Sequence, residues 1–275
     1  MTKTKEETSE KEAKTKEQNI PEELREFIEA GVQFGHLKSH VHPGMFPYIF
    51  GVRNNAHVID VTKTKEKLNE ALESLAKLAQ EGKTILFVGT KVPVRSAVQK
   101  TAEDTGMPYI VNRWFGGTLT NWETIKERLE HLQALKDKTK SEEWSKYPKH
   151  ERMDMEKEIK KLEHFFGGIS SMEKLPDAIF IVDIHEDEIA AKEAKKTGIK
   201  SFAITDTNVN PAMVDHPIPA NDDAVSSVEL ILAWVAEEFK KSKKVKTSTS
   251  KKNTSAKKKS AKKKTKKTAN KKKSK

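Results

Sequence analysis

The sequence predicts a doubly wound α/β fold, in which helices cover both faces of a parallel β-sheet. Bounded apolar runs of strand length alternate along the chain with segments whose apolar residues recur at helical spacing. Because strand and helix alternate, successive strands are expected to lie parallel and buried. The expected strands are residues 84–89, 107–111, 178–183 and 201–206, and the expected helices include residues 92–105, 186–197 and 222–239.

The N-terminal part of the body is expected to hold a helix and a hairpin. Residues 21–31 predict a short amphipathic helix that opens with Pro21 and closes with Gly31. A His- and Pro-rich loop follows. Two apolar runs, 48–52 and 57–61, are then separated by Arg53, Asn54 and Asn55, a pattern typical of a β-hairpin.

Between Leu119 and Phe166 the alternation stops and only helical spacing remains. We expect two antiparallel helices that form a coiled-coil hairpin protruding from the sheet body. The alternative is that these are ordinary helices of the body. On the first interpretation the α/β body comprises residues 20–118 and 167–239, and residues 119–166 are an insertion.

The positive charge of the chain lies at its C-terminal end. The net charge is +11, but residues 240–275 contain 19 lysines and no acidic residue, whereas residues 1–19 contain five Lys and five Glu. Residues 20–239 therefore carry 28 basic and 36 acidic residues, a net charge of −8. A uniformly basic RNA-coating domain is excluded, so any contact of the body with a polyanion has to come from local basic patches.

Both ends of the chain are expected to be disordered, since residues 1–19 and 240–275 have too little apolar surface to offset the entropy of ordering. The lysine blocks of the C-terminal tail can neutralise phosphates without reading sequence, which favours RNA or DNA as their partner. The alternatives are solubilisation and attraction to anionic lipid. These blocks include Lys257, Lys258, Lys259, Lys262, Lys263 and Lys264.

The composition excludes several classes of protein. The chain has no cysteine, so disulfides, thiolate metal sites and a cysteine nucleophile are all ruled out. No apolar run approaches the roughly 18 residues that a membrane span requires, and the charged N-terminus lacks the apolar core of a signal peptide. We expect a soluble protein that stays inside the cell and has no membrane partner.

The segment GTKVPVR, residues 89–95, follows an expected strand and opens an expected helix. In α/β folds this is a position at which a helix N-terminus binds phosphate. The segment lacks the G-x-G-x-x-G fingerprint and the G-x-x-x-x-G-K-[ST] loop, so a nucleotide-binding or hydrolytic enzyme remains only the alternative function. We interpret Lys91 and Arg95 as contacts to a nucleic-acid backbone phosphate, against ordinary solvated charges.

The segment NRWFGGTLTN, residues 112–121, places Arg113 and the aromatic pair Trp114 and Phe115 before two adjacent glycines. Adjacent glycines permit a tight turn or the close approach of a partner. A second pair, residues 167–168, stands where the helical hairpin would return. We favour core positions for the two aromatic residues, at the base of the hairpin, over contacts with a partner.

His36, His40 and His42 crowd one loop, and imidazole is a common zinc ligand. No fourth ligand is evident nearby. With Lys38 and Arg53 at hand, we favour a polar surface loop without a metal.

Several polar residues follow the expected strands, where active sites of α/β proteins often lie. A catalytic cluster would also need a nucleophile, yet no nucleophile elbow is present. Turns and helix caps are therefore the favoured roles of the carboxylates. The residues concerned are Asp183, His185, Asp187, Asp206 and Asp215, with Ser170, Ser171 or Thr205 as the nucleophile.

Seven ordered blocks of sequence support a family resemblance. They are EAGVQFGH (29–36), PYIFGVRNNAHVID (47–60), ILFVGTK (85–91), NRWFGGTLTNWETI (112–125), FGGI (166–169), LPDAIFIVD (175–183) and ITDTNVNPAMVDHPIPANDDA (204–224). Over about residues 20–239 the chain resembles the bacterial form of the second protein of the small ribosomal subunit. Seven blocks in order are far more specific than any single motif.

The resemblance implies a flavodoxin-like parallel sheet that carries a long helical hairpin. It also implies a cytoplasmic, ribosome-bound protein on the solvent side of the small subunit, between head and body. Its partners would be small-subunit ribosomal RNA and neighbouring proteins, including the large mRNA-binding ribosomal protein. It implies no catalysis, cofactor or small-molecule substrate. The matching positions expected to face RNA are Gly35, His36, Arg53, Lys91 and Arg113.

The chain departs from the family pattern in ways that reduce the positive charge of the body. Gly44 and Phe46 stand where lysines are common, and the late blocks read DTNVNP and ANDDA instead of DTNCDP and GNDDA. The long lysine tail is not a general family feature. We expect the tail to compensate for the weakly basic body.

Overall fold

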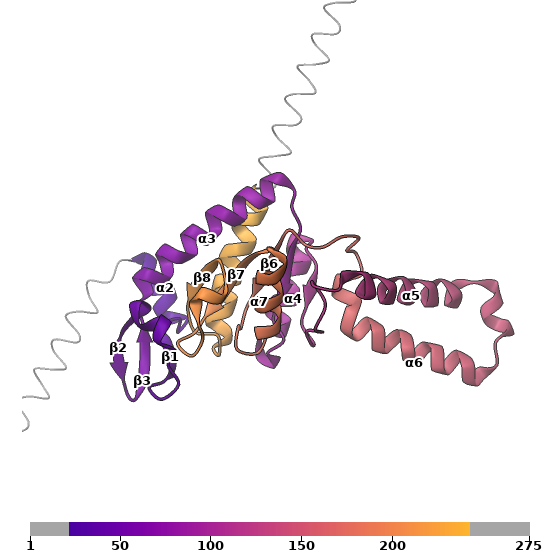
Figure 1. Ribbon diagram of the computed structural model, residues 1–275, viewed down its shortest axis with the longest axis horizontal. Helices are drawn as coiled ribbons and strands as arrows, with labels where there is room; N and C mark the ends of the chain where they lie inside the picture. The colour runs from indigo at the N-terminus through magenta and orange to yellow at the C-terminus, as the bar shows by residue number, and fades with distance from the viewer. Residues whose placement is uncertain (1–21, 243–275) are drawn as a thin grey trace, which may run out of the picture.

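The computed structural model describes residues 22–242, which form two β-sheets, the larger flanked by helices and the smaller at one end of the molecule (Figure 1). The larger sheet is parallel, as predicted, and its strand order is β5-β4-β6-β7-β8. One strand lies on one side of β4 and the later strands lie on the other, which is the arrangement of flavodoxin-like sheets. The strands are β4 (Ile85–Val88), β5 (Tyr109–Ile110), β6 (Ala178–Ile181), β7 (Lys200–Thr205) and β8 (His216–Pro219).

Both faces of the parallel sheet are buried. Successive residues of a strand point to opposite faces, so Phe87 and Phe180 belong to one apolar core and Leu86 and Ile179 to the other. Burial on both faces explains why the strands read as continuous apolar runs. The first core is closed by α2 (Glu22–Glu29), α3 (Val61–Glu81), α4 (Arg95–Thr105) and residues 225–242. The second is closed by α7 (Glu188–Thr197) together with Ile125, Leu129 and Phe166.

The last helix covers residues 225–242, whereas the sequence predicted residues 222–239. Its start is later because the side-chain oxygen of Asn221 accepts the backbone N–H groups of Asp223 and Ala224, at 2.9 and 3.2 Å. These bonds fix a turn that a helix cannot include. Residues 240–242, which were assigned to the tail, are helical.

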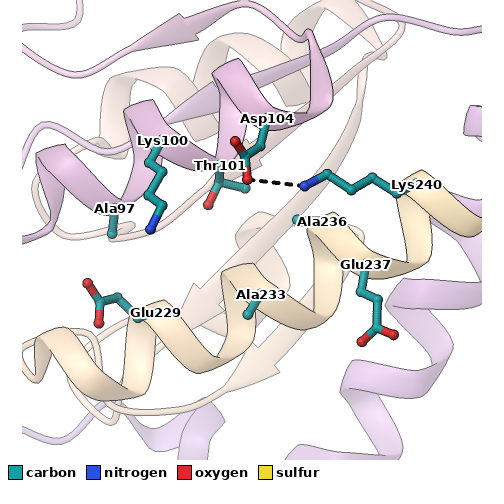
Figure 2. Close-up of a pocket in the computed structure, with 9 residues that line it drawn as sticks. All are labelled: Ala97, Lys100, Thr101, Asp104, Glu229, Ala233, Ala236, Glu237 and Lys240. Atoms are coloured by element: carbon teal, nitrogen blue, oxygen red, sulfur yellow. Dashed lines mark hydrogen bonds and ion pairs between the residues drawn. The ribbon is translucent and has the colours of Figure 1, made fainter.

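The last helix packs against α4 along a shallow hollow of about 420 Å³ (Figure 2). Small side chains, Ala97 on α4 and Ala233 and Ala236 on the last helix, leave this space between the two helices. Lys240 Nζ lies 3.1 Å from Asp104 Oδ2 and joins the helices at one end of the hollow.

No helix in the described part of the chain is long and apolar enough to cross a membrane.

The smaller sheet is antiparallel, with the order β1-β3-β2. Asn54 and Asn55 have φ angles of 50° and 63°, which is the geometry of a type I′ turn, so the predicted hairpin is confirmed. β1 was expected to be loop. It pairs with β3 about twenty residues away, and a pairing at that distance leaves no local signal in so short a strand. The strands are β1 (Phe34–Leu37), β2 (Ile49–Arg53) and β3 (Ala56–Ile59), and η1 (Pro43–Tyr48) precedes β2.

Two long helices, α5 (Trp122–Lys140) and α6 (Lys149–Phe166), replace the strand–helix alternation after β5. They lie side by side and extend away from both sheets in Figure 1. Lys136 Nζ lies 2.7 Å from Glu163 Oε1, so an ion pair joins the two helices. The apolar residues of α5 that are buried are Ile125, Leu129, Leu132 and Leu135.

Aromatic rings and close backbone packing hold the base of this helical pair. The Phe115 ring lies 5.2 Å from the ring of Phe165 and 5.2 Å from that of Phe166, measured between centroids. Gly168 lies so close to the carbonyl oxygen of Tyr109 that a side chain there would overlap it. The glycine pair at residues 167–168 therefore allows the chain to return to the sheet beside β5.

Replacing Gly168 with alanine should lower the free energy of unfolding by about 1–3 kcal/mol, since the methyl group overlaps the Tyr109 backbone. Gly167→Ala is the matched control. No atom lies within 4 Å of its Cβ position and its φ is −55°, so the change should stay below about 1 kcal/mol. Urea unfolding followed by circular dichroism measures both. Equal losses in the two variants would contradict the close packing at Gly168.

Candidate functional site

Charged residues from four loops meet at the carboxyl edge of the parallel sheet. Lys91 follows β4, Asp183 follows β6, Asp206 follows β7, and Asp222 and Asp223 follow β8. Loops at this edge converge because the strands are parallel, and ligand sites of open α/β sheets lie there. The carboxyl edge is therefore the candidate functional site.

Lys91 is held by three carboxylates. Its Nζ lies 3.0 Å from Asp183 Oδ2, 2.8 Å from Asp222 Oδ1 and 2.7 Å from Asp223 Oδ1. Burial alone would lower the pKa of Lys91, but the hydrogen bonds to Asp222 and Asp223 outweigh it and raise the pKa above its usual range. The ammonium group is thus charged and fully engaged within the protein.

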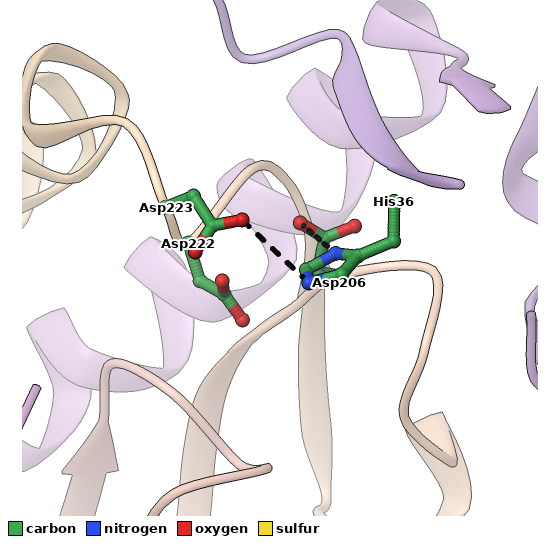
Figure 3. Close-up of side chains that lie close together, drawn as sticks. All are labelled: His36, Asp206, Asp222 and Asp223. Atoms are coloured by element: carbon green, nitrogen blue, oxygen red, sulfur yellow. Dashed lines mark ion pairs between the residues drawn. The ribbon is translucent and has the colours of Figure 1, made fainter. Parts of the chain in front are cut away.

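His36, on β1, reaches the same edge from the smaller sheet (Figure 3). Its Nδ1 lies 3.1 Å from Asp206 Oδ2 and its Nε2 lies 3.6 Å from Asp223 Oδ2. The hydrogen bond to Asp206 raises the pKa of His36 to about 9, against the opposing effect of burial. The ring is therefore protonated at neutral pH and connects β1 to the loops after β7 and β8.

Gly35 allows β1 to lie close to the loop that follows β7. A Cβ atom at Gly35 would lie 2.6 Å from Cγ2 of Thr207, closer than carbon atoms can pack. The backbone N–H of His36 donates to the Thr207 hydroxyl at 2.9 Å. Gly35 and His36 therefore dock the smaller sheet against the larger one.

The cluster contains more negative than positive charge. Four aspartates face one lysine and one histidine, and three of the aspartates, Asp183, Asp206 and Asp222, are almost fully buried. Burial, and then the charges of Asp183 and Asp206, raise the pKa of Asp222 to about 7. Asp222 Oδ2 is buried and has no hydrogen-bond partner among the described residues. The cluster is thus built to take up a proton or a cation.

One imidazole and three carboxylates of this cluster form a possible set of metal ligands. Ligand atoms of His36, Asp206, Asp222 and Asp223 all lie within 4.8 Å of one another. Nitrogen and carboxylate oxygen together suit zinc and similar divalent ions. Sequence reasoning found no fourth ligand for the histidine loop, because the aspartates lie some 170 residues further along the chain.

His40 and His42 are not part of this ligand set. Both line a cleft of about 640 Å³ that His36 and Asp223 also line. His42 Nδ1 accepts the backbone N–H of Gly44 at 3.0 Å and so begins the η1 helix. The three histidines therefore line one cleft, as their spacing in the sequence suggested, but only His36 belongs to the ligand set.

The other carboxylates considered as catalytic hold loops in place. Asp187 accepts the backbone N–H and the hydroxyl of Thr90, at 3.1 and 3.0 Å, and burial raises the pKa of Asp187 to about 6. Asp215 accepts the N–H and hydroxyl of Ser201, at 2.8 and 2.9 Å. The proposed nucleophiles lie apart from them, because Ser170 and Ser171 line a different hollow beside α5 and Thr205 is buried in β7.

The cations selected from the sequence fall into two groups. Lys91 and Arg95 form the first group, because both are bound by other groups of the protein. The Nε of Arg95 donates to the Thr90 carbonyl at 2.8 Å, and its guanidinium also reaches the Asn112 carbonyl. Lys38, Arg53 and Arg113 form the second group. They are exposed, and none has an ion-pair partner among the described side chains. The tail lysines 257–259 and 262–264 lie outside the described residues.

Glu193 is a buried residue that sequence reasoning missed. From α7 its carboxylate accepts the backbone N–H groups of Gly117, Leu119 and Thr120, at 2.6, 2.9 and 3.2 Å. These bonds fix the loop that leads into α5. A glutamate in an amphipathic helix looks solvated from its sequence, so no local signal could have found it. Trp114 is buried nearby, as expected of a core residue.

The fold and the edge cluster define a flavodoxin-like α/β protein whose charged residues mainly hold its own loops together. The model of the family described as Ribosomal protein S2 matches residues 27–242. The chain therefore belongs to the ribosomal protein S2 family. This family consists of structural proteins of the small ribosomal subunit and is not a family of enzymes.

Zinc should bind to the edge cluster and release protons, because His36 and Asp222 hold them near neutral pH and must give them up to become ligands. Titration calorimetry at pH 7 in two buffers of different ionisation enthalpy should detect about one to two protons released per ion. His36→Gln should weaken binding at least about tenfold. His40→Gln is the control, because His40 lines the same cleft but is not in the ligand set. Equal affinity in the two variants would exclude His36 as a ligand.

Proposed function

We propose that the protein is a structural component of the small ribosomal subunit that binds ribosomal RNA and helps to hold neighbouring proteins in place. The observation that carries the proposal is the family match over residues 27–242. A cytoplasmic, ribosome-bound location and the absence of a catalytic role belong to the same proposal.

The exposed cations support RNA contact by local patches. Lys38 and Arg53 lie near the same end of the smaller sheet, where the Lys38 N–H donates to the carbonyl of Asn55 in the hairpin turn. Arg113 lies at the base of the helical pair. Because the body is net negative, such patches are the part of its surface that can approach phosphate.

Gly35, His36, Lys91 and Arg95 contribute to RNA binding in a different way. Their contacts within the protein fix the smaller sheet and the edge loops relative to the larger sheet. A fixed surface docks on a folded RNA by shape and loses less conformational entropy on binding than a mobile one. We therefore assign these four residues to positioning and the exposed cations to phosphate contact.

Apolar side chains on and beside the smaller sheet support a protein neighbour. Phe50 is 80% exposed and Phe46 is 57% exposed, and a group of exposed apolar residues of this kind is typical of an interaction surface. The neighbour we propose for this surface is the large mRNA-binding ribosomal protein. The helical insertion, residues 119–166, would reach a separate part of the subunit. Phe34, Leu37 and Val52 are the other exposed large apolar residues of the smaller sheet.

A nucleotide-binding or hydrolytic enzyme is the weaker candidate. That function requires Lys91 to meet a phosphate, but three carboxylates surround its ammonium group. A phosphate at this edge would face the same carboxylates and be repelled. The edge cluster therefore favours a cation as its ligand.

Sedimentation tests the proposal most simply. In a sucrose gradient of cell extract, we expect the protein to travel with the small subunit and to remain there at moderate salt. A protein found only in the soluble fractions at the top of the gradient would rule out a structural role in the subunit.

Removal of residues 243–275, which contain 17 lysines, should weaken binding to small-subunit RNA and flatten its dependence on salt. Every phosphate that is no longer neutralised reduces the slope of log K against log salt by roughly 0.7–0.9. Removal of residues 2–19, which contain equal numbers of Lys and Glu, is the matched control and should leave the slope unchanged. Filter binding between 50 and 300 mM KCl, in steps of about twofold, measures both. An unchanged slope after tail removal would contradict the role of the tail.

A further inference from the structure

We infer that a pocket at the base of the helical pair binds an unpaired nucleotide of ribosomal RNA, with its base against aromatic rings and its phosphate against three cations. The inference rests on the proposed function, because it names the RNA feature that one surface of the protein recognises.

The pocket lies between the loop after β5, the first turns of α5 and the last turns of α6. Its volume is about 540 Å³, within the range of roughly 300–1,000 Å³ for small-molecule sites. Its walls are rigid, because helices supply two of them and Glu193 fixes the loop at Gly117 through a 2.6 Å hydrogen bond. A site on such elements is formed before its ligand arrives.

Three cations border this pocket, and no acidic side chain lines it. They are Arg113 from the loop, Arg128 from α5 and Lys161 from α6, and all three are exposed. None of them has an ion-pair partner among the described side chains, whereas Lys126, Lys136 and Lys157 of the helical pair do. Three uncompensated positive charges around one hollow favour an anion, and two arginines suit a phosphate.

Aromatic rings supply the rest of the surface. Phe115 and Phe165 are only partly buried and meet edge to face, with centroids 5.2 Å apart and planes at 89°. The Arg113 guanidinium carbon lies 5.8 Å from the Phe115 centroid. Phe166 is buried and stacks on Phe115, with centroids 5.2 Å apart and planes at 29°, so it covers one face of that ring. The partly buried Phe165 is therefore the ring that we assign to the contact with a base. Proteins bind single-stranded RNA by stacking bases on such rings beside cations.

The same features distinguish RNA from an acidic peptide. An acidic peptide would satisfy the cations but has no flat π-surface to match the Phe115 and Phe165 rings. A paired nucleotide could reach the cations, yet its base is stacked within the duplex and cannot enter the pocket. The occupant that uses both the charge and the rings is therefore an unpaired nucleotide.

The test compares single-stranded and double-stranded RNA with the full-length protein, so that the tail contributes to both. A fluorescein-labelled RNA of about 12 nucleotides and its duplex are titrated, and binding is followed by anisotropy. Lys161→Ala should weaken single-strand binding roughly fivefold and duplex binding much less. Lys160→Ala removes the same charge from the next residue of α6, which does not line the pocket, and should change both equally and slightly.

Phe165→Leu should weaken single-strand binding by about 5- to 100-fold, the loss expected for one stacked base. Its thermal unfolding is measured as a check on folding. Arg128→Gln keeps every aromatic contact and should weaken single-strand binding roughly fivefold, so the test does not depend on the phenylalanine variant.

Equal effects of Lys160→Ala and Lys161→Ala would overturn the inference while leaving RNA binding by the protein intact. The inference would also be overturned if polyglutamate displaced the labelled single strand as effectively as unlabelled RNA of equal charge does. Failure of the unaltered protein to bind either RNA would instead overturn the proposed function itself, together with the pocket.

Discussion

The ion pairs at the carboxyl edge of the parallel sheet are the constraint on which the rest of the structure depends. Lys91 joins loops that follow three different strands, and His36 ties the smaller sheet to the same loops. Removing one partner of such a buried pair leaves the other charges unpaired. The loss of stability is then far larger than the stability that an exposed ion pair contributes. The two sheets therefore keep one relative position, and the surfaces that they carry keep theirs.

The edge that holds catalytic groups in many α/β proteins is used here for internal attachment. Its carboxylates bind Lys91, backbone N–H groups or His36, so the groups left free for a nucleic-acid or protein partner lie elsewhere. Those groups are exposed cations such as Arg53 and Arg113, the apolar residues of the smaller sheet, and the pocket beside Phe165. This division suits a protein that is held within an assembly and catalyses nothing.

Local signals in the sequence were enough to predict most of the fold, because strand length, helical spacing and closing glycines such as Gly31 are encoded within a few residues. Contacts between distant segments were not predictable in this way. The sequence placed Lys91 on the surface, and its three carboxylate partners become visible only when the loops after β6 and β8 meet. Glu193 and the aspartates around His36 were missed for the same reason.

The pH dependence of stability tests the role of the edge cluster most directly. The pKa of His36 is about 9 in the folded protein and 6.5 when unfolded, so its contribution is complete below pH 6.5 and is lost as the pH rises through 9. With a metal chelator present, the free energy of unfolding should fall by about 1–2 kcal/mol between pH 7 and 9.5, after allowance for solvent screening of the partly exposed ring. His36→Gln should flatten this decline. Parallel profiles for the two proteins would contradict the account.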